Sequence, residues 1–155
     1  MKIKDLIKLP SIIIGFEAKN KADALSKLSA QFASLHPSID QKKMHEALAR
    51  REELGSTGIG GGVAVPHADY EGLDRTIGMF AVSKKGIEFK SADGAPVHFI
   101  FLFAYSGKDV GERVKVLARV ARLLQHKLVH KHILSAKKPE QIMEIFVAHD
   151  MVSGD

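Results

Sequence analysis

The sequence of 155 residues contains no cysteine and no tryptophan, and only 6% of its residues are aromatic. The absence of cysteine excludes disulfide bonds, cysteine-containing zinc sites and thiol nucleophiles. The low aromatic content disfavours the base-stacking platforms of nucleic-acid-binding proteins. No segment approaches the roughly 20 apolar residues of a membrane helix, and the N-terminal stretch lacks the apolar run of a signal peptide. We therefore expect a soluble, cytoplasmic protein that does not insert into membranes and has no nucleic-acid partner.

The residues that are present have the composition of one globular domain. Hydrophobic residues make up 45% and charged residues 26% of the chain, which argues against disorder and against a coiled coil. A chain of this length buries one core, so we predict a single domain over residues 1–155. The formal net charge is +5, which favours an acidic protein partner. Six of the 23 lysines and arginines give the C-terminal helices a basic character: Arg113, Lys115, Arg119, Arg122, Lys127 and Lys131.

The first third of the chain predicts a short strand and two helices. Residues 11–16 form an apolar run that is typical of a strand. Apolar residues at helical spacing predict a helix over residues 20–35, for which Asn20 is the N-cap. After Pro37, Asp40 is positioned to cap a second helix, which extends to Leu54 and carries Arg51 on its inward stripe.

Glycine dominates the next segment and occupies five of the eight positions from residue 55 to residue 62. Because glycine favours backbone conformations that helices and strands avoid, we predict a loop without regular structure. Three runs with strand character follow, at residues 63–65, 76–82 and 97–105, and we expect them to share one sheet.

The last third of the chain has helical spacing. Apolar residues recur in steps of three and four over residues 110–124, a shorter amphipathic segment covers residues 128–134, and Pro139 suits the first turn of a last helix. We expect the tail from residue 149 to residue 155 to be frayed. Strands and helices in this order predict an α/β sandwich in which helices cover a small mixed sheet.

The glycine-rich segment does not match a nucleotide site. A phosphate-binding P-loop needs Gly-Lys-Ser/Thr at the start of a helix, and the dinucleotide fingerprint connects a strand to a helix. Here the glycines follow a helix and lead into a strand just before His67. Their backbone N–H groups can receive an anion, and a neutral His67 imidazole can act as a nucleophile. Arg51 can bind phosphate oxygens with its planar guanidinium.

A second interpretation of the same residues involves no chemistry. In it, His67 is a hydrogen-bonded surface histidine, the glycines form a turn, and Arg51 pairs with Glu46 or Glu53. Composition alone favours this second interpretation. The complete string over residues 51–68 changes this preference, because it resembles a known family signature.

Residues 51–68 have the sequence Arg-Glu-Glu-Leu-Gly-Ser-Thr-Gly-Ile-Gly-Gly-Gly-Val-Ala-Val-Pro-His-Ala. The string resembles the active-site signature of enzyme IIA domains of the bacterial phosphoenolpyruvate-dependent phosphotransferase system, in the fructose, mannitol and nitrogen-regulatory class. That signature contains an Arg-Glu pair, then Ser-Thr-Gly-Ile-Gly, then Pro-His. The segment Gly94-Ala-Pro-Val97 and the helix after residue 110 extend the resemblance over most of the chain. Within the string over residues 51–68, the segment Leu54-Gly-Ser-Thr-Gly-Ile-Gly is more similar to the nitrogen-regulatory type.

The resemblance implies a three-layer sandwich with a mixed sheet between helices, and a site that requires neither metal nor cofactor. It implies that His67 accepts a phosphoryl group on Nε2 and that Arg51 stabilises this group. The loop residues expected to bind phosphate are Ser56, Thr57, Gly58, Gly60 and Gly61.

One position departs from the family pattern. Many members place a second histidine early in the helix after residue 110, where this chain has Arg113. Arginine neutralises a phosphoryl group but does not exchange a proton at neutral pH, so it would prolong the life of a phosphohistidine or slow its discharge. Alternatively, Arg113 is a solvated helix residue.

The resemblance also implies a histidine phosphocarrier protein as the phosphoryl donor. Three functions then remain open. We favour regulation of a transporter or a kinase, as in the nitrogen-regulatory branch. The alternatives are sugar uptake, with transfer to the cysteine of a separate IIB domain, and a binding module without turnover, in which Arg113 completes a fixed anion pocket.

Three further histidines lie close together in the C-terminal part. His126 and His130 are four residues apart, and His132 is nearby. Two histidines at this spacing can bind a metal, but no other metal-binding residue accompanies them. We therefore expect a solvated basic face rather than a metal site.

Overall fold

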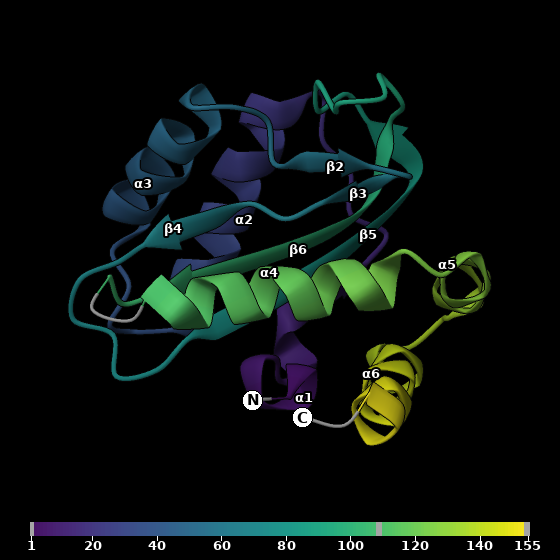
Figure 1. The fold of residues 1–155 in the computed structure, drawn as a ribbon. Helices are drawn as coiled ribbons and strands as arrows, with labels where there is room; N and C mark the ends of the chain where they lie inside the picture. The colour runs from purple at the N-terminus through teal and green to yellow at the C-terminus, as the bar shows by residue number, and fades with distance from the viewer. Residues whose placement is uncertain (1, 108–109, 154–155) are drawn as a thin grey trace.

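One long strand, β6 (Val97–Tyr105), organises the sheet. It pairs antiparallel with β5 (Ile77–Ile87) and parallel with β3 (Val63–Ala64) and β4 (His67–Asp69). β1 (Ile12–Ile14) is parallel to β5, and β2 (Gly58–Gly60) is antiparallel to β3. The structure is a computed structural model that describes residues 2–107 and 110–153, and the strands in these residues form one mixed sheet (Figure 1).

Two helical layers enclose this sheet (Figure 1). One face is covered by α2 (Lys21–Leu35) and α3 (Gln41–Glu53). The other is covered by α1 (Ile3–Leu6), α4 (Val110–Leu124), α5 (Lys127–Ser135) and α6 (Pro139–Ser153). The predicted three-layer α/β sandwich is therefore confirmed. In the described part of the chain, no helix has both the length and the apolar character needed to cross a membrane.

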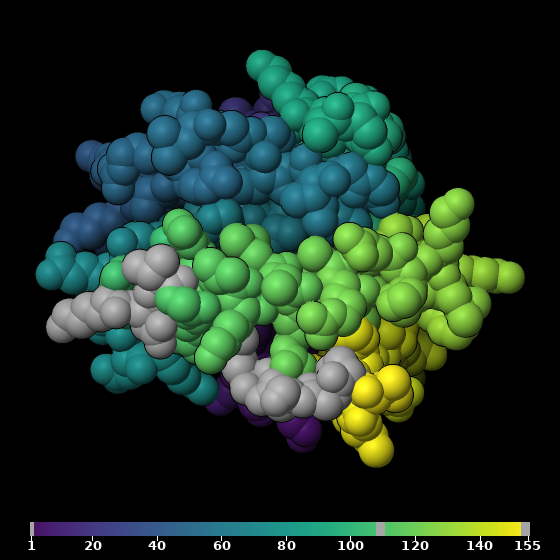
Figure 2. Space-filling view, viewed as in Figure 1, coloured from purple at the N-terminus to yellow at the C-terminus, as the bar shows by residue number. Residues whose placement is uncertain are grey.

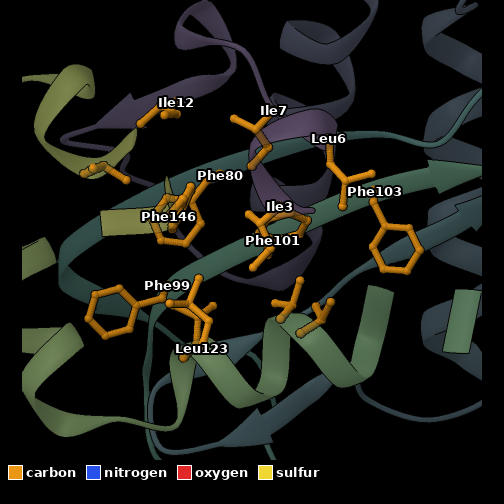
Figure 3. Close-up of a cluster of buried hydrophobic side chains, with 14 of the residues drawn as sticks. Ile3, Leu6, Ile7, Ile12, Phe80, Phe99, Phe101, Phe103, Leu123 and Phe146 are labelled. Carbon is orange, nitrogen blue, oxygen red and sulfur yellow. The ribbon is translucent and has the colours of Figure 1, made fainter. Parts of the chain in front are cut away.

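The strand β6 contributes to both cores, because successive strand residues point to opposite faces of a sheet. Phe99, Phe101 and Phe103 pack under the α1, α4 and α6 layer, as Figure 3 shows for this cluster. Ile100 and Leu102 face α2 and α3. Each fully buried side chain of this size stabilises the fold by about 1.5–3 kcal/mol. The central strand is thus packed on both sides and provides a rigid base for its neighbours.

The helices α2 and α3 begin where the sequence predicts. The side chain of Asn20 accepts a hydrogen bond from the Asp23 N–H at 2.9 Å, and that of Asp40 accepts one from the Lys43 N–H at 2.9 Å. Each satisfies a donor that has no partner within the first helical turn. α3 ends at Glu53, one residue before the predicted end.

The glycine-rich segment is more regular than the sequence predicts. Gly58–Gly60 form β2, which pairs with β3 through a bulge, so the prediction of a loop without regular structure is wrong for these residues. Gly60 has a positive φ that glycine reaches at little cost. At Gly58 a Cβ would lie 2.3 Å from the Ser91 Oγ. β2 can therefore lie this close to Ser91 only because residue 58 has no side chain. β4 is also absent from the sequence prediction, and β5 continues to Ile87.

The predicted fraying of the C-terminal tail is wrong as far as residue 153, because α6 continues to Ser153. Asp150 is 1% exposed, and its two carboxylate oxygens accept hydrogen bonds from the N–H groups of Ile3 and Lys4, each at 3.0 Å. These are donors of the first turn of α1, which have no partner within the helix. The tail is therefore tied to the N-terminal helix. Residues 154 and 155 of the predicted tail lie outside the described residues.

Candidate functional site

Pro66 interrupts the strand that carries His67. β3 and β4 both pair in parallel with β6, and Pro66, which has no N–H to donate, lies between them. At this interruption the Val65 carbonyl accepts a hydrogen bond from a side chain, the Nδ1 of His67, at 2.9 Å. This bond fixes the orientation of the His67 ring at the start of β4.

The hydrogen bonds of His67 determine its tautomer. The Val65 carbonyl can only accept, so Nδ1 carries the proton. On the other side of the ring, the Nε–H of Arg51 donates to the Nε2 of His67 at 3.2 Å. Because a guanidinium can only donate, Nε2 presents its lone pair. The nitrogen that the family resemblance implies as phosphoryl acceptor is the unprotonated one.

The environment of His67 favours the neutral form of its ring. His67 is 4% exposed and stacks on Phe103, with the ring centroids 5.2 Å apart. Burial lowers the pKa of His67, the hydrogen bond to Val65 raises it in part, and the positive charges of Arg51 and Arg113 lower it again. A neutral imidazole is the form that can act as a nucleophile.

Arg51 is held by the end of its own helix. Its Nη1 donates to the Gly55 carbonyl at 2.9 Å, which satisfies a carbonyl just beyond the last turn of α3. In residues 2–107 and 110–153, no ion pair joins Arg51 to Glu46 or Glu53. The interpretation of Arg51 as a partner of these glutamates is therefore wrong, and the buried His67 is not a surface histidine.

A pocket of about 550 Å³ opens beside His67 and Val65. One side, which we call the loop wall, consists of Arg51, Ser56, Thr57 and Ile59. The opposite side, which we call the helix wall, belongs to α4 and consists of Arg113, Val114, Leu117, Ala118 and Ala121. Figure 2 shows α4, in green, crossing this face of the molecule next to the blue segment that contains α3 and β2. The structure thus brings His67, Arg51 and Arg113 to one pocket.

The predicted phosphate-binding loop is only partly at this pocket. Ser56 and Thr57 line it, whereas Gly58, Gly60 and Gly61 do not. The N–H of Thr57 donates to Glu52 at 3.1 Å, and the N–H of Gly61 donates to Asp93 at 2.9 Å. Several donors that the sequence assigns to phosphate are therefore bound to carboxylates of the protein itself. A direct role of these residues in phosphate binding stays a prediction.

Sequence reasoning gave no individual role to two charged residues next to the pocket. Glu52 follows Arg51 in the chain, and its carboxylate is bound by Lys21 and by Thr57. The Arg-Glu pair of the signature was the only sequence signal for Glu52. Lys21 lies 31 positions earlier, and no local pattern connects it to the loop.

Of the three C-terminal histidines, His126 and His132 are exposed and His130 is partly buried. His130 packs against the Phe99 ring at 4.6 Å, and its Nε2 is hydrogen-bonded to the Leu124 carbonyl. In the part of the chain that the structure describes, no group of three histidine, aspartate or glutamate side chains is placed to hold a metal ion.

Known proteins resemble this chain in both sequence and fold. A model of the family described as phosphoenolpyruvate-dependent sugar phosphotransferase system, EIIA 2, matches residues 5–149. A nitrogen regulatory protein of Bradyrhizobium diazoefficiens is 33% identical over 145 residues, which cover 94% of each protein. The fructose-specific EIIABC component of Bacillus subtilis is 30% identical over 97% of this chain and 24% of that protein. The crystal structure of the nitrogen regulatory protein IIA-Ntr from Neisseria meningitidis, 27% identical, has a TM-score of 0.87 and covers 93% of this chain and 98% of that one.

Proposed function

Because the chain belongs to the family of EIIA 2 domains of the phosphoenolpyruvate-dependent sugar phosphotransferase system, we propose that it is a phosphocarrier. Its His67 accepts a phosphoryl group on Nε2 from a histidine phosphocarrier protein. The observation that carries this proposal is the 3.2 Å contact between the Arg51 Nε–H and the lone pair of His67 Nε2 inside an accessible pocket.

In the proposed step, the lone pair of Nε2 attacks the phosphorus atom of the donor's phosphohistidine in line. The N–P bond to His67 forms while the N–P bond of the donor breaks, and the electron pair of the broken bond returns to the donor imidazole, which leaves neutral. The proton on Nδ1 stays in its hydrogen bond to the Val65 carbonyl. This bond also stabilises the positive charge that the His67 ring gains.

Positive charge supplies the remaining assistance. The transition state of phosphoryl transfer is loose, so positioning and charge neutralisation contribute most. As the bond to phosphorus forms, Arg51 releases Nε2 and donates its N–H groups to the phosphoryl oxygens. Arg113 contributes a second cation from the helix wall.

The surface around the pocket is suited to a protein partner. Ile59 and Val114, on the two walls, are 48% and 55% exposed and present apolar surface at the pocket. Residues 110–135 contain six lysines and arginines but a single glutamate, so their net charge is +5. The remaining residues carry seventeen charges of each sign, so this segment accounts for the whole net charge of the chain. We expect a partner that docks across α4 and α5 to be acidic at that contact.

For the fate of the phosphoryl group we favour regulation. Nitrogen regulatory relatives match nearly the whole chain in sequence and in fold. In that branch, the phosphorylation state would control binding to a transporter or a kinase in the cytoplasm. Sugar uptake, with transfer to the cysteine of a separate IIB domain, is the second candidate, because a fructose-specific component is also 30% identical.

Labelling with phosphoenolpyruvate, enzyme I and a histidine phosphocarrier protein tests the acceptor. We expect the wild type to gain an acid-labile phosphoryl group and His67→Ala to gain none, since it lacks the nucleophile. His36→Ala is the matched control, because His36 is partly buried and burial lowers its pKa as it lowers that of His67. Undiminished labelling of His67→Ala contradicts the proposal.

A second assay separates the three functions. The phosphorylated protein is mixed with a IIB domain, and label that moves to the IIB cysteine indicates sugar uptake. Retention of the label, together with phosphorylation-dependent binding to a transporter or a kinase, supports regulation. A wild type that binds inorganic phosphate at the pocket but never becomes labelled is a binding module.

A further inference from the structure

Lys21 and Glu52 form a mostly buried ion pair behind the loop wall. Lys21 Nζ lies 2.8 Å from Glu52 Oε2, and the two side chains are 19% and 7% exposed. Lys21 is the first residue of α2, and Glu52 lies in the last turn of α3. Neither residue lines the pocket itself. The pair therefore acts on the site only through the residues that it holds.

Those residues are Ser56 and Thr57, the two hydroxyl-bearing residues of the loop wall. Glu52 Oε2 accepts a hydrogen bond from the Thr57 N–H at 3.1 Å, and Glu52 Oε1 accepts one from the Thr57 hydroxyl. Lys21 Nζ donates to the Ser56 Oγ at 3.2 Å, and this hydroxyl donates to the Phe89 carbonyl at 2.9 Å. Lys21 Nζ also lies 5.0 Å from the centre of the Phe89 ring. The ion pair thus ties both wall residues to the helices α2 and α3.

The two charges are disfavoured by the helices that carry them. The N-terminus of a helix favours negative charge and the C-terminus favours positive charge. Lys21 is a cation at the N-terminus of α2, and Glu52 is an anion near the C-terminus of α3. The helix dipoles therefore do not explain why a lysine and a glutamate occupy these two positions. Their contact with each other and their contacts with the loop do explain it.

The charge of Glu52 also matters for His67. A carboxylate without a partner beside this pocket would repel a phosphoryl group and weaken the effect of Arg51, the preceding residue. Lys21 balances that carboxylate at 2.8 Å. The loop thus gains the two acceptor oxygens of Glu52 without adding net negative charge to the site.

We propose that Lys21 and Glu52 are positioning residues for phosphoryl transfer at His67, which hold Ser56 and Thr57 in the loop wall and keep the charge beside His67 balanced. This assignment rests on the function proposed for His67. It gives a role to the glutamate of the Arg-Glu pair and identifies its partner in α2.

The test uses Lys21→Met, Glu52→Gln and the double variant. We expect each single variant to slow labelling by about 10- to 100-fold, since loss of positioning away from the reacting atoms has effects of this size. The pKa of His67, followed by NMR titration of its ring, should rise in Lys21→Met and fall in Glu52→Gln. It should return close to the wild-type value in the double variant, because both charges are then absent.

Opposite shifts distinguish a balanced charge pair from a general loss of structure, which would move the His67 pKa in the same direction in both variants. Lys21→Arg keeps the charge and should recover most of the labelling rate. Lys27→Met and Glu53→Gln are the matched controls, because Lys27 makes an exposed ion pair with Asp23 in α2 and Glu53 is an exposed neighbour in α3. If Lys21→Met does not fold, the test is the fall of the His67 pKa in Glu52→Gln and its return towards the wild-type value in the double variant. A double variant with the same pKa as Glu52→Gln would then overturn the charge balance.

The result separates this proposal from the function on which it rests. A wild type that is never labelled would overturn the function, while the NMR titration would still measure the charge pair. Equal labelling in Glu52→Gln and the wild type, or a His67 pKa that shifts in one direction in both single variants, would overturn the positioning role alone.

Discussion

The two walls of the pocket around His67 differ in how their charges are arranged. In the loop wall and the residues behind it, each charged group has a defined partner, since Arg51 contacts Gly55 and His67, and Glu52 contacts Lys21. On the other side, residues 110–135 of α4 and α5 carry six positive charges and one negative charge. The charges of one wall are held in place by short-range contacts, and the other wall belongs to a surface with an excess of positive charge.

This difference indicates a division of tasks. A charge held by a partner stays in place and acts on nearby atoms, whereas an excess of one sign acts over a longer range and is screened by salt. We therefore expect substitutions in the loop wall to change the rate of the chemical step. Substitutions on the outer surface of α4 should change the association with a partner.

The largest effect is expected from Arg51→Ala in the loop wall. Removal of the cation that contacts Nε2 should slow labelling at saturating donor by about 100- to 1,000-fold, the range for loss of a group that stabilises transition-state charge. Single-turnover labelling measures this rate. Arg50→Ala is the control, because Arg50 is the exposed neighbour in the same helix. Similar rates for the two variants would remove the distinction between the walls.

A smaller effect is expected from Arg113 in the helix wall. Arg113 lowers the pKa of His67 less than Arg51 does, so Arg113→Ala should slow labelling by only about tenfold. Arg113→His introduces a group that exchanges protons at neutral pH. The phosphorylated form of this variant should lose its label faster than the wild type, as measured by the decay of isolated phosphoprotein. An unchanged lifetime would show that Arg113 does not act on the phosphoryl group.

Charge reversal on the outer surface of α4 should affect association but not chemistry. Lys115 and Arg122 are exposed, and neither lines the pocket. Lys115→Glu combined with Arg122→Glu should raise the apparent KM for an acidic partner by about 3- to 10-fold at low salt, with the difference shrinking as salt increases. Lys42→Glu combined with Lys84→Glu is the control on other exposed positions. A lower rate at saturating partner would contradict the division of tasks.

The smallest effect concerns pH. The pKa of His67 is lowered in the folded state by burial and by Arg51 and Arg113, so the unfolded chain binds the proton more readily. The contribution of His67 to the free energy of unfolding is therefore fully present above the unfolded pKa of about 6.5, and it is lost as the pH falls below that value. Urea unfolding at pH 8 and pH 5 measures this loss. Labelling should continue at pH values somewhat below 6.5, because the folded ring is still neutral there.

His36 provides a check on that pH effect. Burial lowers its pKa as well, with Arg75 and Lys8 adding to the shift, but its Nε2 has no hydrogen-bond partner among the described residues. His36→Gln should therefore narrow the difference in stability between pH 8 and pH 5 while leaving labelling intact. Substitution of the exposed His132 by Gln serves as the surface control. Loss of labelling in His36→Gln would contradict the assignment of His67 as the only histidine needed to accept the phosphoryl group.

Local patterns predicted most of the fold. The caps at Asn20 and Asp40 and the apolar spacing of the helices are properties of neighbouring residues, so the sequence reveals them directly. β2 and β4 could not be recognised, because so short a strand forms only where a neighbouring strand offers it hydrogen bonds. That neighbour is β3 for β2 and β6 for β4. The end of α6 was missed for a similar reason, since Asp150 is held by hydrogen bonds from α1, at the other end of the chain.

The candidate site was predictable where its residues lie close together in the chain. Arg51 and His67 are 16 positions apart and belong to one recognisable string. Lys21 does not belong to it, and its contact with Glu52 depends on the packing of α2 against α3. The donors of the glycine segment were visible, but their binding to Glu52 and Asp93 was not.

The sequence by itself determined that no thiol takes part, that a histidine follows a glycine-rich segment, and that positive charge accumulates in one stretch of the chain. Only the tertiary structure decided which nitrogen of His67 carries the proton, which group Arg51 contacts, and how the charge of Glu52 is balanced. The physical reason is that composition and order are properties of the chain. A hydrogen bond also requires a distance and a direction, and these exist only once the sheet and its two helical layers have assembled.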